Sequence, residues 1–153
     1  MDVKKIAVQT AAKYKTWNPY EIADARNVQI IHAPLKSILG YYTKYKRIQC
    51  IILNDNIPAP LQRFVCAHEL GHSICHANLN TQWLRKNTLV STDRIEREAS
   101  TFAVELLLPD DFIRAYPDYS LKSLGKMVGI PADLCLLKKF DKRICTCRKV
   151  VIL

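Results

Sequence analysis

Residues 68–72 read His68-Glu69-Leu70-Gly71-His72, and this stretch decides how the chain is interpreted. In an α-helix of about 3.6 residues per turn, side chains four residues apart lie on one face. His68 and His72 would therefore present two imidazoles to one metal ion, as in metalloprotease sites. Glu69 lies about 100° further round the helix, where its carboxylate can reach a water molecule at the ion. The pattern predicts one catalytic Zn²⁺ with a general base beside it.

A catalytic zinc usually takes three protein ligands and leaves one position open. The other candidate ligands are the thiols of two cysteines and the side chains of four later residues: Cys66, Cys75, His76, Glu96, Glu98 and Glu105. His76 lies about 6 Å further along the same helix, and three successive turns of one straight helix cannot converge on one ion. His76 is therefore expected either to line the cleft or to be a polar residue of the helix's last turn.

The third ligand is predicted from a second helix, which runs from about residue 92 to residue 108 and is stopped by Pro109. At about 100° per residue, its apolar stripe consists of Ile95, Ala99, Phe102, Ala103 and Leu106. Glu98 and Glu105 fall opposite this stripe and should face solvent. Glu96 lies at its edge, above Ser100, where a carboxylate is costly unless it is paired or bound to metal. We predict Glu96 as the third ligand, the alternative being a rim glutamate paired with Arg97.

Periodicity and turn residues predict the remaining elements. Asn18-Pro19 begins a second short helix, because Asn is a good N-cap and Pro suits the first helical position. Gly71 is costly inside a helix, which indicates close approach of backbone or sheet. Helices are expected over residues 2–16, 19–26, 59–77, 111–115, 120–128 and 131–140, and strands over 28–32, 40–43 and 47–53. A polar linker precedes Thr92, and residues 144–153 are either a strand or a disordered tail.

The composition of the 153 residues predicts a single cytoplasmic domain. No run of 18 apolar residues could cross a membrane, and the N-terminus has no secretory signal pattern. The six cysteines are then expected to be mostly buried free thiols. Cys145-Thr146-Cys147 does not have the spacing of a zinc site.

The net charge of +9 is concentrated at the two ends of the chain. Residues 1–50 carry nine Lys and Arg against three acidic residues, and residues 131–153 carry six against two, whereas residues 51–130 are nearly neutral. This surplus favours either attraction to nucleic acid or an acidic partner, or simply a lysine-rich solvated surface.

Three stretches together resemble the ImmA/IrrE family of small zinc metallopeptidases. They are Ile51–Asn54, Arg63–His76 and Glu96–Pro109, which match a strand ending in Asn, the pattern RF..AHELGH and the pattern E.EA..FA.ELL.P. The resemblance implies an α+β, zincin-like fold, with a small sheet of about three strands packed on the HExxH helix and short helices at the C-terminal end. It also implies His68, His72 and Glu96 as zinc ligands and Glu69 as the catalytic base. Ser100 departs from the family, which often has Asn there.

The resemblance further implies a cytoplasmic endopeptidase of phage or mobile-element type that cleaves a helix-turn-helix repressor. The alternative is a zinc-stabilised module that binds a repressor or a toxin–antitoxin partner without cutting it. The metallopeptidase domain is expected to span residues 1–115, with residues 116–153 packed on it. Ser120–Pro131 looks like the first part of a helix-turn-helix, and is either simple helical packing or a recognition surface.

An extended substrate is expected along an edge strand near residues 47–53. The oxyanion of the reaction needs a further hydrogen-bond donor. The candidates are Tyr41, Tyr42, Tyr45 and His76.

Overall fold

The computed structural model describes residues 1–78 and 92–140. The N-terminal part contains α1 (Val3–Tyr14), α2 (Pro19–Ala25), β1 (Val28–Ala33), β2 (Gly40–Tyr45), β3 (Ile48–Asn54) and α3 (Ala59–Cys75). The C-terminal part contains α5 (Thr92–Leu107), α6 (Asp110–Ala115), α7 (Leu121–Met127) and the 3₁₀ helix η1 (Ala132–Leu137). The expected elements are confirmed, except that η1 is 3₁₀ rather than α-helical. The expected linker before Thr92 and the tail at residues 144–153 fall outside the described residues.

The first two helices begin where the sequence predicts. The side chain of Asn18 accepts a hydrogen bond from the backbone N–H of Tyr20 at 3.1 Å, and Pro19 occupies the first helical position. Asp2 caps α1 in the same way, by accepting from the N–H of Lys5. Each cap satisfies a backbone donor that the first turn of a helix leaves without a partner.

The strands form one mixed sheet in the order β1-β3-β2. β1 runs parallel to β3, with Ile31 opposite Ile52, and β2 runs antiparallel to β3, with Tyr42 opposite Ile51. The expectation that residues 47–53 form an edge strand is therefore wrong, because β3 is the central strand. The apolar run Ile51-Ile52-Leu53 suits that position, since β3 has a neighbouring strand along each edge and these three residues are buried.

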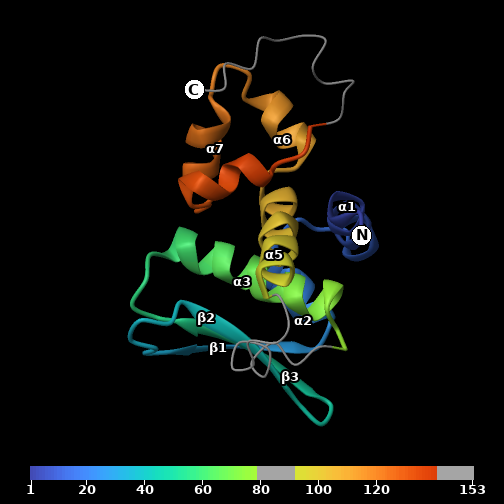
Figure 1. Ribbon diagram of the computed structural model, residues 1–153, viewed down its shortest axis with the longest axis vertical. Helices are drawn as coiled ribbons and strands as arrows, with labels where there is room; N and C mark the ends of the chain where they lie inside the picture. Colours follow the sequence, from blue (N-terminus) through green and yellow to red (C-terminus); the bar gives the residue numbers. More distant parts are fainter. Residues whose placement is uncertain (79–91, 141–153) are drawn as a thin grey trace.

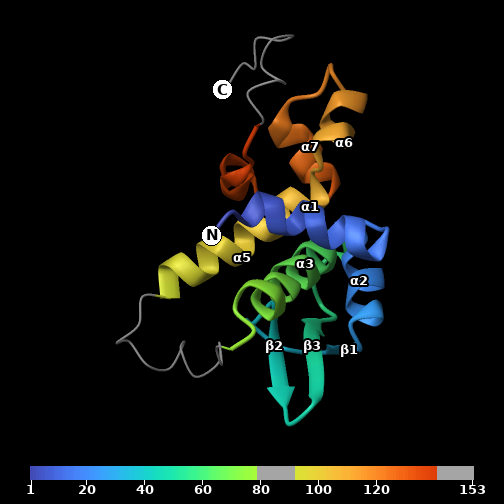
Figure 2. The same ribbon diagram turned by 90° about the vertical axis from the view of Figure 1, so that its right-hand side faces the viewer.

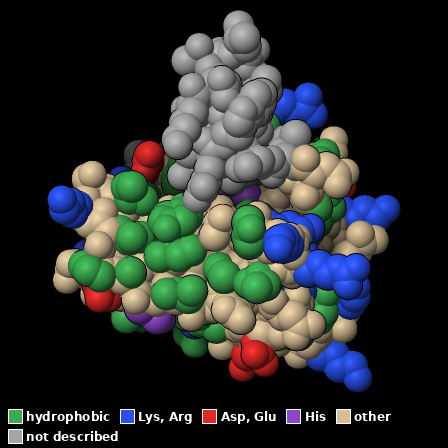
Figure 3. All heavy atoms as spheres, turned by 90° about the horizontal axis from the view of Figure 1, so that it is seen from below, with side chains coloured by type: hydrophobic (Ala, Val, Ile, Leu, Met, Phe, Trp, Pro, Cys, Tyr) green, Lys and Arg blue, Asp and Glu red, His purple; other side chains and the backbone are tan. Residues whose placement is uncertain are grey.

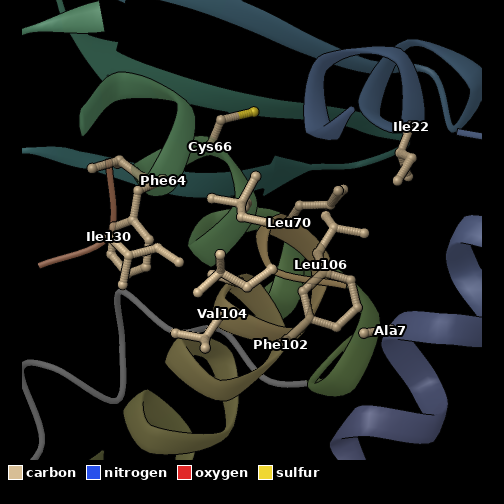
Figure 4. Packing of buried hydrophobic residues seen from close by; sticks show 14 of the residues in the cluster. Ala7, Ile22, Phe64, Cys66, Leu70, Phe102, Val104, Leu106 and Ile130 are labelled. Carbon is tan, nitrogen blue, oxygen red and sulfur yellow. The ribbon is translucent and has the colours of Figure 1, made fainter. Parts of the chain in front are cut away.

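The sheet, α3 and α5 form successive layers (Figures 1 and 2). α3 lies across one face of the sheet, and α5 crosses α3 on the side away from the strands. Leu70 of α3 lies beside Val104 and Leu106 of α5 in the hydrophobic core, and Phe64 lies beside Ile130 (Figure 4). α1 and α2 close this core from the side. This arrangement gives the small zincin-like α+β domain that the sequence predicts.

No helix or strand of residues 1–78 and 92–140 covers the other face of the sheet, which is called the open face below. Ile31 is 43% exposed and Ile48 is 58% exposed, and hydrophobic side chains gather on the side of the molecule seen in Figure 3. Because side chains alternate along a strand and Tyr42 is buried toward α3, Tyr41 turns to this open face. No helix within the part of the chain that the structure describes is long and apolar enough to cross a bilayer.

Buried ion pairs hold the C-terminal segment, which contains Lys138 and Lys139, against α5. Glu105 and Lys138 are each 1% exposed at the side chain, and Lys138 Nζ lies 2.6 Å from Glu105 Oε2 and 2.7 Å from Asp110 Oδ1. The backbone N–H of Lys139 donates to Glu105 Oε1 at 2.7 Å. The expectation that Glu105 faces solvent is therefore wrong. Glu98 is also mostly covered, with its side chain 17% exposed.

The segment from Ser120 to Pro131 contributes packing to the C-terminal end. Leu124 of α7 is completely buried, and a Cβ at Gly125 would overlap the Sγ of Cys135 in η1. The inner face of α7 therefore packs against η1, while Met127 remains 56% exposed.

Candidate metal centre

Two histidines of α3 converge one turn apart. The Nε2 atoms of His68 and His72 lie 3.1 Å from each other, and the two rings meet edge to face. The side chain of His72 is fully buried, while that of His68 is 14% exposed. The four-residue spacing thus turns two imidazole nitrogens toward one point at the edge of solvent.

α5 brings a carboxylate to the same point. Glu96 Oε2 lies 3.2 Å from His68 Nε2, and Glu96 Oε1 lies 3.4 Å from His72 Nε2. The possible ligand atoms of the three residues all lie within 4.8 Å of one another. The helical-wheel argument that separated Glu96 from Glu98 and Glu105 therefore selects the glutamate that meets both histidines.

These distances can be compared with those around a tetrahedral zinc ion. With metal–ligand bonds of about 2.0–2.1 Å, two ligand atoms of a tetrahedral site lie about 3.3 Å apart. The three separations of 3.1, 3.2 and 3.4 Å are each close to that value. Two nitrogens and one oxygen are also the donor set of a common class of catalytic zinc site. The donor set and its spacing therefore fit a zinc ion.

Gly71 lets the two helices come this close. A Cβ at this position would lie 3.1 Å from the carbonyl oxygen of Ala99 and 3.2 Å from its Cα, both closer than ordinary contact. The close approach inferred from the sequence is thus to the backbone of α5. Even an alanine at position 71 would require the backbone of α5 at Ala99 to give way by a few tenths of an ångström.

Glu96 is held in its ionised form. Burial would raise the pKa of its carboxyl group, but hydrogen bonds and charge interactions with His68 and His72 outweigh burial and lower the pKa well below its usual range. A carboxylate must be deprotonated to bind a metal. The thiols that the sequence offered as alternatives are in the opposite condition: burial raises the pKa of Cys66 to about 12 and that of Cys75 to about 11. Both remain neutral thiols, which are poor ligands.

Glu69 lies beside this group and contacts the sheet. Glu69 is 3% exposed, and its Oε2 accepts a hydrogen bond from the backbone N–H of Tyr42 at 2.9 Å. Strand β2 thereby fixes the orientation of the carboxylate. The sequence does not predict this contact, because any residue at position 42 other than proline offers the same backbone donor.

Ser100 contacts the imidazole of His68, one of the predicted ligands. Its Oγ lies 3.2 Å from Nδ1 of His68, on the side of the imidazole away from Glu96. The family that the sequence resembles often has Asn at this position. The serine hydroxyl does reach the histidine.

The other predicted site residues differ in where they lie relative to the proposed ligands. His76 is 8% exposed, its ring lies 6.0 Å from that of His72, and its Nε2 lies 3.4 Å from Glu98 Oε2. The hydroxyl of Tyr42 donates to Gln49 Oε1 at 2.8 Å, so Tyr42 contacts the site through its backbone. Tyr41 faces the open side of the sheet, and Tyr45 is 71% exposed at the end of β2.

Comparisons with known proteins agree with this architecture. Residues 23–132 match the model of the IrrE N-terminal-like domain, a peptidase family. The chain is 44% identical over 142 residues to "Uncharacterized immunity region protein 2" of Bacillus phage phi105, covering 90% of each chain. It is 36% identical over 150 residues to "Metallopeptidase ImmA" of Bacillus subtilis (strain 168), covering 92% of this chain and 89% of that relative.

Among solved structures, a Mycobacterium tuberculosis transcriptional regulator matches with a TM-score of 0.60 at 15% identity, over 89% of this chain and 45% of that one. At that identity the match supports the fold alone. The sequence comparisons extend over the sheet, α3 and α5, which carry the candidate centre. The chain therefore belongs to the ImmA/IrrE family of metallopeptidases.

Proposed function

We propose that this protein is a zinc-dependent endopeptidase in which His68, His72 and Glu96 hold the ion and Glu69 is the general base. The observation that carries the proposal is the set of three separations between the ligand atoms, 3.1, 3.2 and 3.4 Å. They are close to the spacing that one tetrahedral zinc ion requires. The buried Glu69, fixed by Tyr42 N–H, adds the proton acceptor that peptide hydrolysis needs.

The residues of the chain divide the reaction between them. When bound, zinc supplies Lewis acidity, which acidifies water and polarises the scissile carbonyl. Glu69 takes the proton of the attacking water and later delivers it to the leaving amine. The hydrogen bond from Tyr42 N–H keeps this carboxylate from rotating away. Of the four candidate donors to the oxyanion, His76 is the one whose ring lies 6.0 Å from that of the proposed ligand His72, and it is the donor that this contact favours.

The position of β2 supports an extended peptide as substrate. β2 is an edge strand of the sheet and contacts Glu69 through its backbone. A peptide that adds to an edge strand is bound through its main chain, with side-chain pockets adding specificity. The proposed track therefore runs along β2 rather than along the central strand β3.

We further propose that the substrate is a helix-turn-helix repressor and that its cleavage relieves repression in a phage or mobile element. Two things support this role: the phage relative is named as an immunity region protein, and the bacterial relative is named as the metallopeptidase ImmA. A repressor is also a soluble protein substrate, which suits an endopeptidase.

Glu69→Gln tests the assignment. The variant is expected to keep zinc, since Glu69 is not a proposed ligand, and to lose cleavage of the helix-turn-helix repressor encoded nearest to its gene by at least about 100-fold. Glu21→Gln, an exposed change in α2, is the matched control and should cleave normally. Cleavage is followed by mass spectrometry of the products. Full activity in Glu69→Gln would refute the role of Glu69, and a stable uncut complex with the wild-type protein would favour the binding-module alternative.

A further inference from the structure

Both ring nitrogens of His68 contact side chains of α5. Its Nε2 lies 3.2 Å from Glu96 Oε2, and its Nδ1 lies 3.2 Å from Ser100 Oγ. Glu96 and Ser100 are four residues apart on α5, so they lie one above the other on the same helix face. One face of α5 therefore offers a carboxylate to one edge of the imidazole and a hydroxyl to the other.

We propose that Ser100 is a positioning residue that sets the orientation and the tautomer of His68 for metal binding. For Nε2 to offer its lone pair to an ion, the ring proton must be on Nδ1. Ser100 Oγ is within hydrogen-bond distance to accept that proton's hydrogen bond, and Ser100 is only 8% exposed, so water has little access to compete. This inference rests on the proposed function, because it assigns the ligand role to His68.

A hydroxyl suits this position because it can both donate and accept. Without an ion, His68 Nε2–H can donate to Glu96 while Nδ1 accepts from Ser100 O–H. With the ion bound, Nδ1–H donates to Ser100 Oγ instead. The same two side chains satisfy both tautomers, so the ring need not move when the metal binds. Alanine at position 100 would satisfy neither.

The short side chain of Ser100 reaches the ring because the helices are unusually close. Ala99, the residue before Ser100, has its backbone against Gly71, where an added Cβ would lie 3.1–3.2 Å away. Gly71 is also one turn from His68 on the same helix. The close packing of Gly71 on Ala99 thus sets the reach of the Ser100 hydroxyl.

Ser100→Ala tests the inference by its zinc affinity, measured by competition with a chromophoric chelator. Loss of a partner to a ligating histidine typically weakens metal binding by about 10–100-fold, and we expect a loss in this range. Ser73→Ala is the matched control: Ser73 is 2% exposed in α3, and its hydroxyl donates to the carbonyl of Leu70 at 2.8 Å. It should bind zinc like the wild type. Ser100→Thr, which retains the hydroxyl, should recover most of the affinity.

A second measurement separates positioning from simple stabilisation of α5. In the zinc-loaded wild type, the Nδ1–H proton of His68 should be protected from solvent exchange and visible by NMR, and in zinc-loaded Ser100→Ala it should exchange faster. Wild-type affinity in Ser100→Ala, or an equal loss in Ser73→Ala or Ser100→Thr, would overturn the inference while leaving the proposed function intact. If the wild type binds no zinc, both are overturned.

Discussion

Replacing the buried Lys138 with methionine should lower the free energy of unfolding by more than the same replacement at an exposed lysine. Lys138 Nζ lies 2.6 Å from Glu105 Oε2 and 2.7 Å from Asp110 Oδ1, and the side chains of Lys138 and Glu105 are each 1% exposed. Methionine has a similar length and no charge. Lys138→Met therefore leaves the hydrophobic packing nearly intact and removes the cation from two carboxylates.

The expected cost follows from the asymmetry between making and breaking a buried ion pair. At an effective dielectric constant near 20, two unit charges this close attract by about 6 kcal/mol, but desolvation of each ion offsets much of that gain. Removal of one partner leaves the other charge buried, which costs about 3–5 kcal/mol. The loss is a large fraction of the about 5–15 kcal/mol that stabilises a typical domain.

The complementary change should cost less. In Glu105→Gln, Lys138 keeps Asp110 as its partner, and the glutamine oxygen can still accept from Lys139 N–H. A lost charge-assisted hydrogen bond of this kind is worth about 1.5–3 kcal/mol. The double variant should lose less than the sum of the two single losses, because the two residues interact directly.

Urea denaturation at neutral pH, followed by circular dichroism, measures these free energies of unfolding. Lys139→Met is the matched control, since the side chain of the neighbouring lysine is exposed and its contact to Glu105 is made by the backbone. The control should change stability by less than about 0.5 kcal/mol. If Lys138→Met is no less stable than Lys139→Met, the buried network does not hold the C-terminal segment and the reasoning fails.

Two further predictions use the same unfolding assay. The pKa of Asp110 is lowered, because hydrogen bonds and charge interactions with Lys138 and Lys4 outweigh the effect of burial; its contribution to stability is therefore complete above the unfolded pKa of about 3.9 and is lost as the pH falls below it toward the folded value. Urea midpoints between pH 6 and pH 3 should fall less steeply in Asp110→Asn than in the wild type, and parallel curves would contradict this account. Gly71→Ala should lose about 1–3 kcal/mol to overpacking against Ala99, which exceeds the gain of about 1 kcal/mol in helix propensity. A more stable Gly71→Ala, or one with wild-type zinc affinity, would mean that α5 shifts without moving Glu96.

The elements and the candidate centre follow largely from local sequence. The caps at Asp2 and Asn18, the strand patterns and the histidine spacing are short-range signals, and each element forms where these signals predict it. Glu96 was separated from its neighbouring glutamates by helical periodicity alone. The structure does bring Glu96 to both histidines, but the same argument is wrong for Glu98, whose side chain is only 17% exposed and contacts His76.

The same argument failed at Glu105 for a physical reason. The second half of α5, from residue 99 to residue 107, is buried all round, because α3 packs on one side while α1 and η1 pack on others. Val104 and Leu108, which lie away from the predicted apolar stripe, are both 0% exposed. Apolar residues on every side of a helix indicate complete burial, so the sequence itself indicates that this half of α5 is buried. The partner, Lys138, is 33 residues away in sequence and no local pattern identifies it.

The sequence does not predict the strand order for a similar reason: no local pattern indicates where β1 joins the sheet. Turn residues between β2 and β3 predict that these strands pair, but they do not indicate on which side β1 joins. Only the continuous apolar run of β3 favours the central position.

α5 connects the candidate metal centre to the C-terminal segment without making them one site. Glu96 and Glu105 are nine residues apart, which places them about 180° apart round the helix and about 13 Å apart along its axis. Glu96 and Ser100 therefore face α3, while Glu105 faces Lys138 on the opposite side. A rigid helix transmits a change at one end only if it moves as a whole, and the close packing of Gly71 on Ala99 opposes such movement. Folded Lys138→Met is thus expected to bind zinc within about twofold of the wild type, since distant sites without shared partners act independently. A large loss of zinc affinity in that variant would mean that the buried Lys138 network, and not Gly71, sets the position of α5 against the histidines.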